Sequence, residues 1–220
     1  MEAAIFDIDG TLVDSVDLHA ECWREALAHF GHDVPFERVR SQIGKGGDQL
    51  LPVFVPEAEL ELRGKEIERY RGDLFKRSYL PAVRPFPLVR ELFARIRSAG
   101  LKIVLASSAK GDELGAYKRI ASIEDLVDGE VSGDDVEHSK PYPDVFQAAL
   151  GRAAPLAAAE AMAIGDSPYD AEAAGRAGLA TIGILAGGFP EADLRRAGCI
   201  AVYRSPADLL EQFDRSPLAR

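Results

Sequence analysis

Short apolar runs alternate with longer amphipathic segments along most of this 220-residue chain. The short runs end at a glycine or an acidic residue, as buried strands of a parallel sheet often do, and the longer segments repeat apolar residues at the three-to-four spacing of helices. Strands are predicted at residues 3–8, 102–107, 129–132, 161–165, 180–185 and 199–203. Helices are predicted at residues 87–99, 142–152, 169–177, 191–197 and 206–213. The pattern predicts an α/β fold with a doubly wound parallel sheet.

The stretch of residues 15–84 has a different pattern. It contains no convincing strand, and helices are predicted within it at residues 18–30 and 58–79, separated by glycines and prolines. This stretch falls between the first two strands, at the sheet edge where sites form, so we expect a helical cap inserted over the site. The predicted division is a catalytic core of residues 1–14 and 85–220 and a cap of residues 15–84.

The formal net charge of −10 argues against nonspecific binding to nucleic acid or anionic lipid. A metal ion and a few local cations can still make a pocket suitable for an anionic substrate. The two cysteines, Cys22 and Cys199, have no zinc-site spacing. The chain starts without a basic segment and has no apolar run long enough to span a bilayer, so we expect a cytoplasmic protein without a nucleic-acid or membrane partner. The sequence favours neither a monomer nor an oligomer.

Two carboxylates stand at the carboxyl end of the first predicted strand. Asp7 and Asp9 are two residues apart, and Gly10 frees the backbone to turn behind them. Carboxylates that converge in one pocket need a cation, a shared proton or both. A Mg²⁺ ion would satisfy this, leaving one carboxylate to attack phosphorus and the other to transfer a proton. A solvated Asp-Gly turn explains this motif, taken alone, about equally well.

Polar residues also follow three later strands at the same edge. Ser107 and Ser108 offer donors to a phosphoryl oxygen, although a serine there more often caps a helix or forms a turn. Lys140 lies in a proline-stiffened loop, where its charge could neutralise phosphate and orient Asp7, although an isolated lysine is usually only solvated. Asp166 is placed to ligate a metal ion, and Asp170 either caps the following helix or binds a metal-bound water.

Four successive strand ends thus supply a nucleophile, an acid, metal ligands, a hydroxyl donor and a cation. This set resembles the haloacid dehalogenase-like superfamily. The first motif of that superfamily is similar to the run Phe6-Asp7-Ile8-Asp9-Gly10-Thr11-Leu12-Val13-Asp14-Ser15. Its remaining motifs are similar to Ser107, Lys140-Pro141 and Gly165-Asp166-Ser167-x-x-Asp170. The resemblance spans nearly the whole chain.

The resemblance implies a role for each matching residue. Asp7 would be the nucleophile and Asp9 the general acid and base, with Mg²⁺ held by Asp7, the Asp9 carbonyl and Asp166. Ser107 and Lys140 would bind the phosphoryl group. The implied activity is a phosphatase of a small phosphorylated metabolite, of the phosphoglycolate or sugar phosphate type, with an aspartyl-phosphate intermediate. A β-phosphoglucomutase-like phosphomutase is the alternative, because it shares all these motifs.

Three cap residues are weaker candidates for substrate binding. Lys45 lies in a glycine-bearing loop that faces the site in the resembling family, and a solvated lysine is the alternative. His19 and Trp23 share a helix face and are similar in placement to the His-x-x-x-Trp of β-phosphoglucomutase-like proteins. Packing of Trp23 in the cap, with His19 at the cap's edge, is the favoured interpretation. The charge-rich stretch of residues 63–77 is predicted to be the exposed face of a cap helix.

A phospho-accepting signalling module is an alternative of a different class. Response-regulator receivers also gather aspartates, a hydroxyl residue and a lysine at the edge of a parallel sheet. The second aspartate beside Asp7 and the insertion of residues 15–84 both oppose this alternative.

Overall fold

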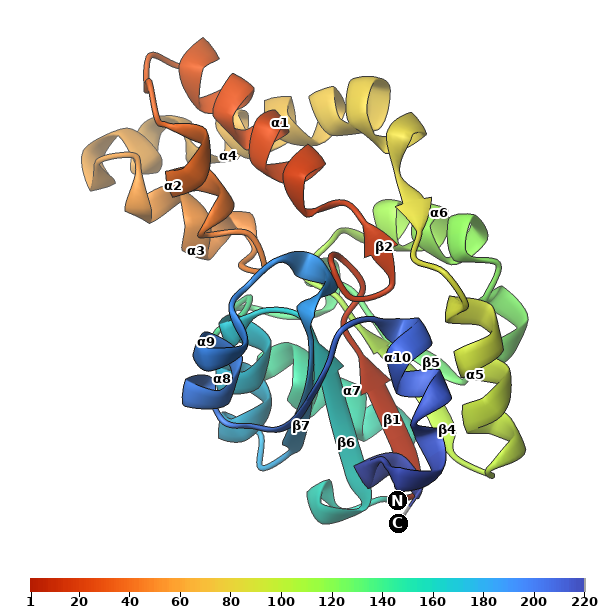
Figure 1. The fold of residues 1–220 in the computed structure, drawn as a ribbon. Coiled ribbons are helices and arrows are strands. Elements are labelled where there is room, and N and C mark those ends of the chain that lie inside the picture. The colour runs from red at the N-terminus through yellow and green to blue at the C-terminus, as the bar shows by residue number, and fades with distance from the viewer. Residues whose placement is uncertain (220) are drawn as a thin grey trace.

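A six-stranded parallel sheet forms the centre of the computed structural model, which describes residues 1–219 (Figure 1). The strand order is β5-β4-β1-β6-β7-β8, and every neighbouring pair is parallel. The bounds are β1 Ala3–Phe6, β4 Lys102–Ala106, β5 Gly129–Val131, β6 Ala161–Gly165, β7 Ala180–Ile184 and β8 Cys199–Tyr203. The predicted α/β fold and its six strands are confirmed.

Helices cover both faces of this sheet. Successive side chains of β1 point to opposite faces, so Ala4 and Phe6 join one apolar cluster while Ala3 and Ile5 join another. Helices α5, α6 and α10 pack on the first cluster, and α7 and α8 pack on the second. The bounds are α5 Val89–Ser98, α6 Gly111–Ala121, α7 Asp144–Ala153, α8 Pro168–Arg176, α9 Glu191–Ala197 and α10 Pro206–Glu211.

Helix α6 has no counterpart among the helices expected from the sequence. Its apolar face is narrow, with Leu114, Tyr117 and Ala121 at helical spacing, and Gly115 weakens the helical signal in its middle. The tertiary contacts of the buried Leu114 and Tyr117 stabilise it instead. This omission bears on the site, because α6 also carries the buried Glu113.

A group of helices lies between β1 and α5 in the sequence and sits over the carboxyl end of the sheet (Figure 1). The chain leaves and re-enters the sheet region through an antiparallel pair, β2 Val13–Asp14 and β3 Arg84–Pro85. These strands were not expected, because two residues are too few for an alternating pattern. The helices between them are α1 Val16–His29, α2 Phe36–Arg40, α3 Gly47–Leu50 and α4 Glu57–Leu74, which a π-helical turn at Phe75–Tyr79 extends.

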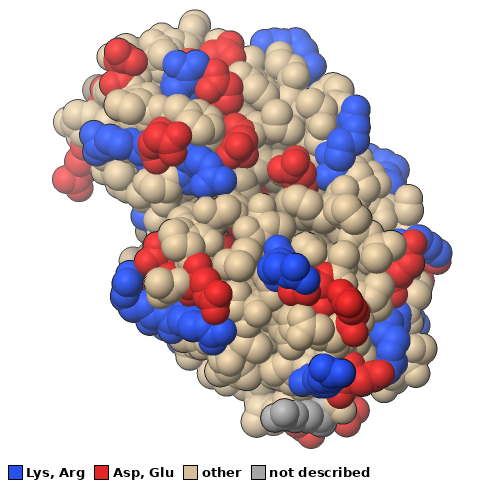
Figure 2. Space-filling model, in the orientation of Figure 1, with Lys and Arg blue, Asp and Glu red and all other residues tan. Residues whose placement is uncertain are grey.

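These helices have an apolar cluster of their own, to which Trp23, Leu27, Leu50 and Ile67 belong. The division into a core of residues 1–14 and 85–220 and a cap of residues 15–84 stays a prediction, and we refer to α1–α4 and their connections as the cap. Basic and acidic side chains are interspersed over the face shown in Figure 2. Within residues 1–219, no helix combines the length and the apolar character needed to cross a membrane.

Candidate active site

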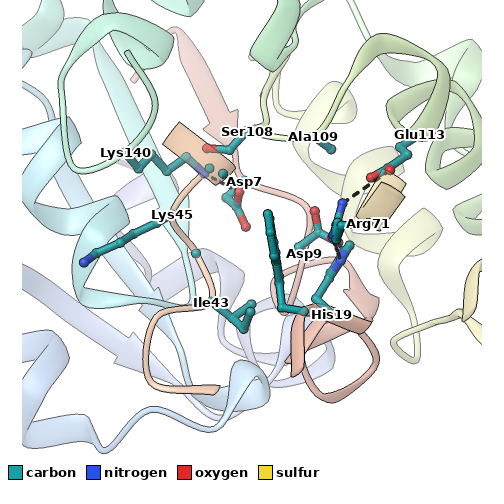
Figure 3. A pocket seen from close by; sticks show the side chains of 14 residues that line it. Asp7, Asp9, His19, Ile43, Lys45, Arg71, Ser108, Ala109, Glu113 and Lys140 are labelled. Atoms are coloured by element: carbon teal, nitrogen blue, oxygen red, sulfur yellow. Dashed lines mark hydrogen bonds and ion pairs between the residues drawn. The ribbon is translucent and has the colours of Figure 1, made fainter. Parts of the chain in front are cut away.

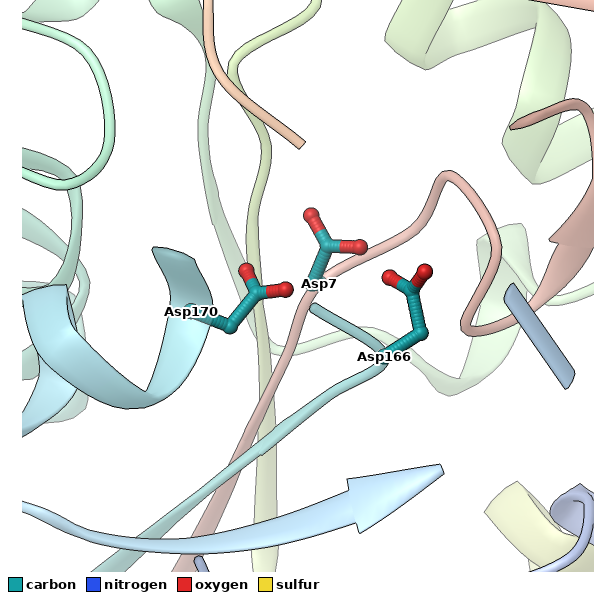
Figure 4. A group of neighbouring side chains, drawn as sticks. All are labelled: Asp7, Asp166 and Asp170. Atoms are coloured by element: carbon teal, nitrogen blue, oxygen red, sulfur yellow. The ribbon is translucent and has the colours of Figure 1, made fainter. Parts of the chain in front are cut away.

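Three aspartates converge at the carboxyl end of the sheet (Figure 4). Asp7 directly follows β1, Asp166 directly follows β6, and Asp170 lies in the first turn of α8. Each is at most 5% exposed, and one carboxylate oxygen from each lies within 4.8 Å of the others. The hydroxyl of Thr11 donates to Asp7 Oδ2 at 3.0 Å and lies 3.2 Å from Asp166 Oδ1. The parallel sheet therefore brings these three carboxylates into one buried cluster.

Lys140 is the cation of this cluster. Its ammonium group contacts Asp7 Oδ1 and lies 2.7 Å from Asp170 Oδ1, and its side chain is 1% exposed. Burial alone would lower the pKa of Lys140, but Asp170 and Asp7 outweigh burial and raise it. Three buried carboxylates and one ammonium group leave two negative charges without a partner in the cluster when all are ionised.

The pKa values of the aspartates reflect this excess of negative charge. Burial raises the pKa of Asp7 to about 7, with repulsion from Asp170 and Asp9 adding to it and Lys140 opposing it. Burial, followed by repulsion from Asp170 and Asp7, also raises the pKa of Asp166 well above its ordinary value. A divalent cation among these oxygens would offset the repulsion and favour the ionised carboxylates. The donor set, made only of oxygens, therefore fits a hard divalent metal ion.

Asp9 is held apart from the cluster and faces the cap (Figure 3). Its Oδ1 accepts from Ser15 Oγ at 2.6 Å and lies 2.8 Å from His19 Nε2. The other nitrogen of His19 contacts the guanidinium of Arg71, which can only donate, so Nε2 carries the proton and donates to Asp9. Burial alone would raise the pKa of Asp9, but His19 and Ser15 outweigh it and lower this pKa to about 2. The hydroxyl of Tyr117 also lies 2.9 Å from His19 Nε2.

The two serines after β4 differ in their surroundings. The Ser107 hydroxyl is fully buried and accepts from the backbone N–H of Ala109 at 3.0 Å. Ser108 lines the cavity between cap and core, and its buried hydroxyl has no hydrogen-bond partner among residues 1–219. Accepting the bond from Ala109 leaves the proton of the Ser107 hydroxyl free to donate, so both serine hydroxyls can still donate to a phosphoryl oxygen.

The sequence pattern of the haloacid dehalogenase-like hydrolases matches residues 4–184. The chain belongs to this family. Its predicted membership is thus confirmed, and it is a hydrolase.

Relatives within the family support the same assignment. The chain is 28% identical over 211 residues to a phosphorylated carbohydrates phosphatase of Thermotoga maritima, covering 96% of this chain and 97% of that protein. It is 33% identical over 187 residues to a phosphoglycolate phosphatase of Yersinia pestis, covering 83% and 80%. The crystal structure of a hydrolase from Pseudomonas syringae superposes with a TM-score of 0.90 at 29% identity, covering 98% of this chain and 99% of that one. A putative β-phosphoglucomutase from Bacteroides vulgatus shares the fold, with a TM-score of 0.85 at 23% identity over 97% and 88% of the chains.

The three cap candidates are placed differently in this hydrolase. His19 was expected at the cap's edge. It is instead only 5% exposed, because its ring nitrogen Nε2 contacts Asp9 and Tyr117 in the interior. Trp23 packs in the cap cluster, as expected, and also lines the cavity. Lys45 lines the cavity too, but its ammonium group points away from Asp7 (Figure 3) and lies 4.7 Å from the centre of the Tyr169 ring.

Sequence reasoning missed two further charged residues that line the cavity, Arg71 and Glu113. The stretch of residues 63–77 was expected to be exposed, but the Arg71 side chain is only 14% exposed and turns inward against His19 and Trp23. The helical spacing of α4 offers a signal that was overlooked, because Arg71 lies four residues after the buried Ile67 and three before the buried Leu74, on the same face of the helix. Glu113 was missed together with α6.

A glycine-bearing loop of the cap, residues 43–48, docks directly on the core. The backbone N–H of Gly46 donates to Ser139 Oγ at 2.9 Å, and the Asp48 carboxylate accepts from the backbone N–H of Ser139 at 3.1 Å. A Cβ atom at Gly44 would lie 2.6 Å from Ser167 Oγ. The loop thus contacts the residues that immediately precede Lys140 and follow Asp166.

Proposed function

We propose that the chain is a Mg²⁺-dependent phosphatase that hydrolyses a small phosphorylated metabolite through an aspartyl-phosphate intermediate on Asp7. The observation that carries this proposal is the buried Asp7 carboxylate, which shares one cluster with two other aspartates and contacts Lys140. The cavity that it lines also contains Asp9 and Ser108. The phosphatases of Thermotoga maritima and Yersinia pestis described above support the same class of reaction.

Each residue has a chemical role in this proposal. Asp7 attacks phosphorus in line, the bond from phosphorus to the ester oxygen breaks, and Asp9 gives a proton to the departing alcohol. Lys140 offsets charge on the phosphoryl oxygens, and the hydroxyls of Ser107 and Ser108 donate to them. A water then gives its proton to Asp9 and attacks the phosphoryl group, which releases inorganic phosphate and restores Asp7.

Asp7, Asp166 and the backbone carbonyl of Asp9 would hold the Mg²⁺ ion, with Asp170 bound to it directly or through a water. The ion would neutralise the carboxylate cluster and draw charge from the phosphoryl oxygens. The low pKa of Asp9 keeps its carboxylate ionised, which is the state that can accept a proton from water in the second half-reaction, whereas the first half-reaction requires Asp9 to carry a proton.

The size of the cavity supports a small substrate. Cap and core leave a cavity of only about 70 Å³ beside Asp7, Asp9 and Lys140. Small-molecule sites typically span about 300–1,000 Å³, so this space favours a phosphoryl group that carries few additional atoms.

A sugar phosphomutase is the second candidate. Its supporting observation is that His19 and Trp23, in the spacing that resembles β-phosphoglucomutase-like proteins, both line the cavity and that His19 contacts Asp9. A mutase would convert one sugar phosphate into its isomer without net release of phosphate.

The test is phosphate release from a panel of phosphorylated metabolites, with Mg²⁺ or with a chelator, by the wild-type protein and by Asp7→Asn. We expect Mg²⁺-dependent release that Asp7→Asn abolishes while the fold is retained, because the amide removes the nucleophile at nearly unchanged volume. Release by the purified variant at the wild-type rate would exclude the covalent mechanism. Isomerisation of β-glucose 1-phosphate without release would indicate the mutase, and stable labelling of Asp7 without turnover would indicate a phospho-accepting module.

A further inference from the structure

The positive charges that line the cavity are Lys140, Lys45 and Arg71. Lys140 is bound to the aspartate cluster, and in the proposed reaction its charge would be offset by the transferred phosphoryl group. The ammonium group of Lys45 donates to Gln42 Oε1 at 2.6 Å and lies over the Tyr169 ring. Arg71 is therefore the cation that would meet the remaining part of the substrate.

Arg71 is already neutralised by Glu113. Arg71 Nη1, from the cap helix α4, lies 3.5 Å from Glu113 Oε1, from the core helix α6, and the Glu113 side chain is 3% exposed. The guanidinium also lies over two rings, 5.2 Å from the centre of Trp23 and 4.9 Å from that of Phe75, so its place is fixed on several sides. A buried glutamate without a partner is costly, so Glu113 needs Arg71 beside it.

This pair does not use all of its hydrogen-bonding capacity. Arg71 Nε has no partner among residues 1–219, and a separation of 3.5 Å between Arg71 and Glu113 is too long for a strong hydrogen bond. A hydroxyl group can donate to Glu113 and accept from Arg71 at the same time. A carboxylate can only accept, and it would be repelled by Glu113.

A neighbouring opening beside Arg71 and Glu113 adds no excess positive charge. That opening shares Arg71 and Glu113 with the site and adds Lys110, Asp48 and Glu68. One cation there faces two carboxylates, so the opening has no excess positive charge for an anionic group.

We propose that Glu113 determines specificity. By neutralising Arg71, it makes the site select phosphate monoesters whose remaining part is uncharged and carries hydroxyl groups, and disfavour those with a second anionic group such as a carboxylate. This inference rests on the proposed phosphatase function. The motifs leave both phosphoglycolate and sugar phosphates open as substrate types, and this inference favours the hydroxyl-bearing sugar phosphates.

Two matched substrates test the proposal. 2-Phosphoglycolate and 2-hydroxyethyl phosphate differ only in a carboxylate in place of a hydroxymethyl group. The wild-type enzyme should have the higher kcat/KM for 2-hydroxyethyl phosphate. Glu113→Gln keeps the shape but frees the charge of Arg71, so the ratio of the two kcat/KM values should shift toward phosphoglycolate by about tenfold or more.

Asp112→Asn is the control. Asp112 precedes Glu113 on α6 and pairs with Lys76 of the cap, but it is exposed and outside the cavity. Its substitution should leave the substrate ratio unchanged. A ratio unchanged in a folded Glu113→Gln would overturn the proposal. If that variant does not fold, the wild-type ratio decides, and a wild-type preference for phosphoglycolate would overturn it as well.

Binding separates this inference from the proposed function. Calorimetric titration of Asp7→Asn with both compounds, in the presence of Mg²⁺, measures the preference without turnover. Tighter binding of 2-hydroxyethyl phosphate, lost when Glu113→Gln is added, would support the role of Glu113 even if no phosphate were ever released. Turnover of the panel without any difference between the two compounds would instead leave the phosphatase standing and refute the role of Glu113.

Discussion

Gly46 allows the cap loop to approach the segment that carries Lys140. A Cβ atom at this position would lie 2.5 Å from both Cβ and Oγ of Ser139. The backbone of Gly46 has φ −77°, which any residue adopts, so the conformation itself imposes no need for glycine. A substitution by alanine therefore tests the close approach alone.

The expected size of the effect follows from this distance. Carbon atoms in contact prefer about 3.5–4.0 Å, so Gly46→Ala must move the loop or Ser139 by about 1 Å. That shift would break the 2.9 Å bond from the Gly46 N–H to Ser139 Oγ and weaken the bonds to Asp48. Because Ser139 precedes Lys140, and a misplacement of about 1 Å can lower a rate about 100-fold, we expect kcat/KM to fall about 10- to 100-fold. Overpacking should also lower the free energy of unfolding by about 1–3 kcal/mol.

Gly64→Ala is the matched control, because it adds the same methyl group elsewhere in the cap. Gly64 lies inside α4, and the nearest atoms to its Cβ would be at 3.8 Å, an ordinary contact distance. We expect wild-type kcat/KM and a gain of up to about 1 kcal/mol in the free energy of unfolding, since alanine favours helix. Both variants would be compared by steady-state phosphate release and by urea unfolding. Wild-type kcat/KM in Gly46→Ala would refute the view that the loop positions the Lys140 segment.

Two further substitutions test other contacts. Tyr117→Phe removes the hydroxyl that lies 2.9 Å from His19 Nε2 but keeps the buried ring. We expect kcat to fall about fivefold, which corresponds to one lost hydrogen bond, with little change in stability. An unchanged kcat would show that the Tyr117 hydroxyl does not contribute to the reaction. Hydrogen bonds from Arg204 lower the pKa of Asp208 to about 2. The ionised Asp208 therefore stabilises the folded state above pH 4, and this stabilisation is lost as the pH falls toward 2. Because Arg204 is exposed and screened by solvent, Asp208→Asn should lower the free energy of unfolding at pH 7 by only about 1 kcal/mol. Urea unfolding of both proteins should show a smaller difference at pH 3.

The sequence predicted the sheet and the convergence of Asp7, Lys140 and Asp166, because both follow from local patterns. Short buried runs identify the strands, and parallel strands of one sheet must present their carboxyl ends at one edge. Asp170 was expected to be either a helix cap or a group near the metal. It accepts from both the N–H and the hydroxyl of Ser167 and belongs to the carboxylate cluster, so the structure gives it both environments.

The contacts made across the cap and core could not be derived in this way. Arg71 shares the buried face of α4 with Ile67 and Leu74, but the spacing of α4 alone does not show that it meets Glu113 of α6. His19 is buried because Asp9, Tyr117 and Arg71 come from three separate elements to surround it. Such interactions depend on how two helices are oriented, which the spacing of residues along either helix does not determine.

The carboxylates of Asp7 and Asp9 are supported by different parts of the molecule. Asp7 contacts Thr11 and Lys140, which belong to the sheet edge, whereas Asp9 accepts from residues at the start of the first cap helix. The group that we propose to attack phosphorus is therefore placed by the core, and the group that we propose to transfer the proton is placed by the cap. A displacement of α1 would alter the surroundings of Asp9 before it disturbed the carboxylate cluster. Proton transfer to the leaving alcohol should accordingly depend on cap position more strongly than metal binding does.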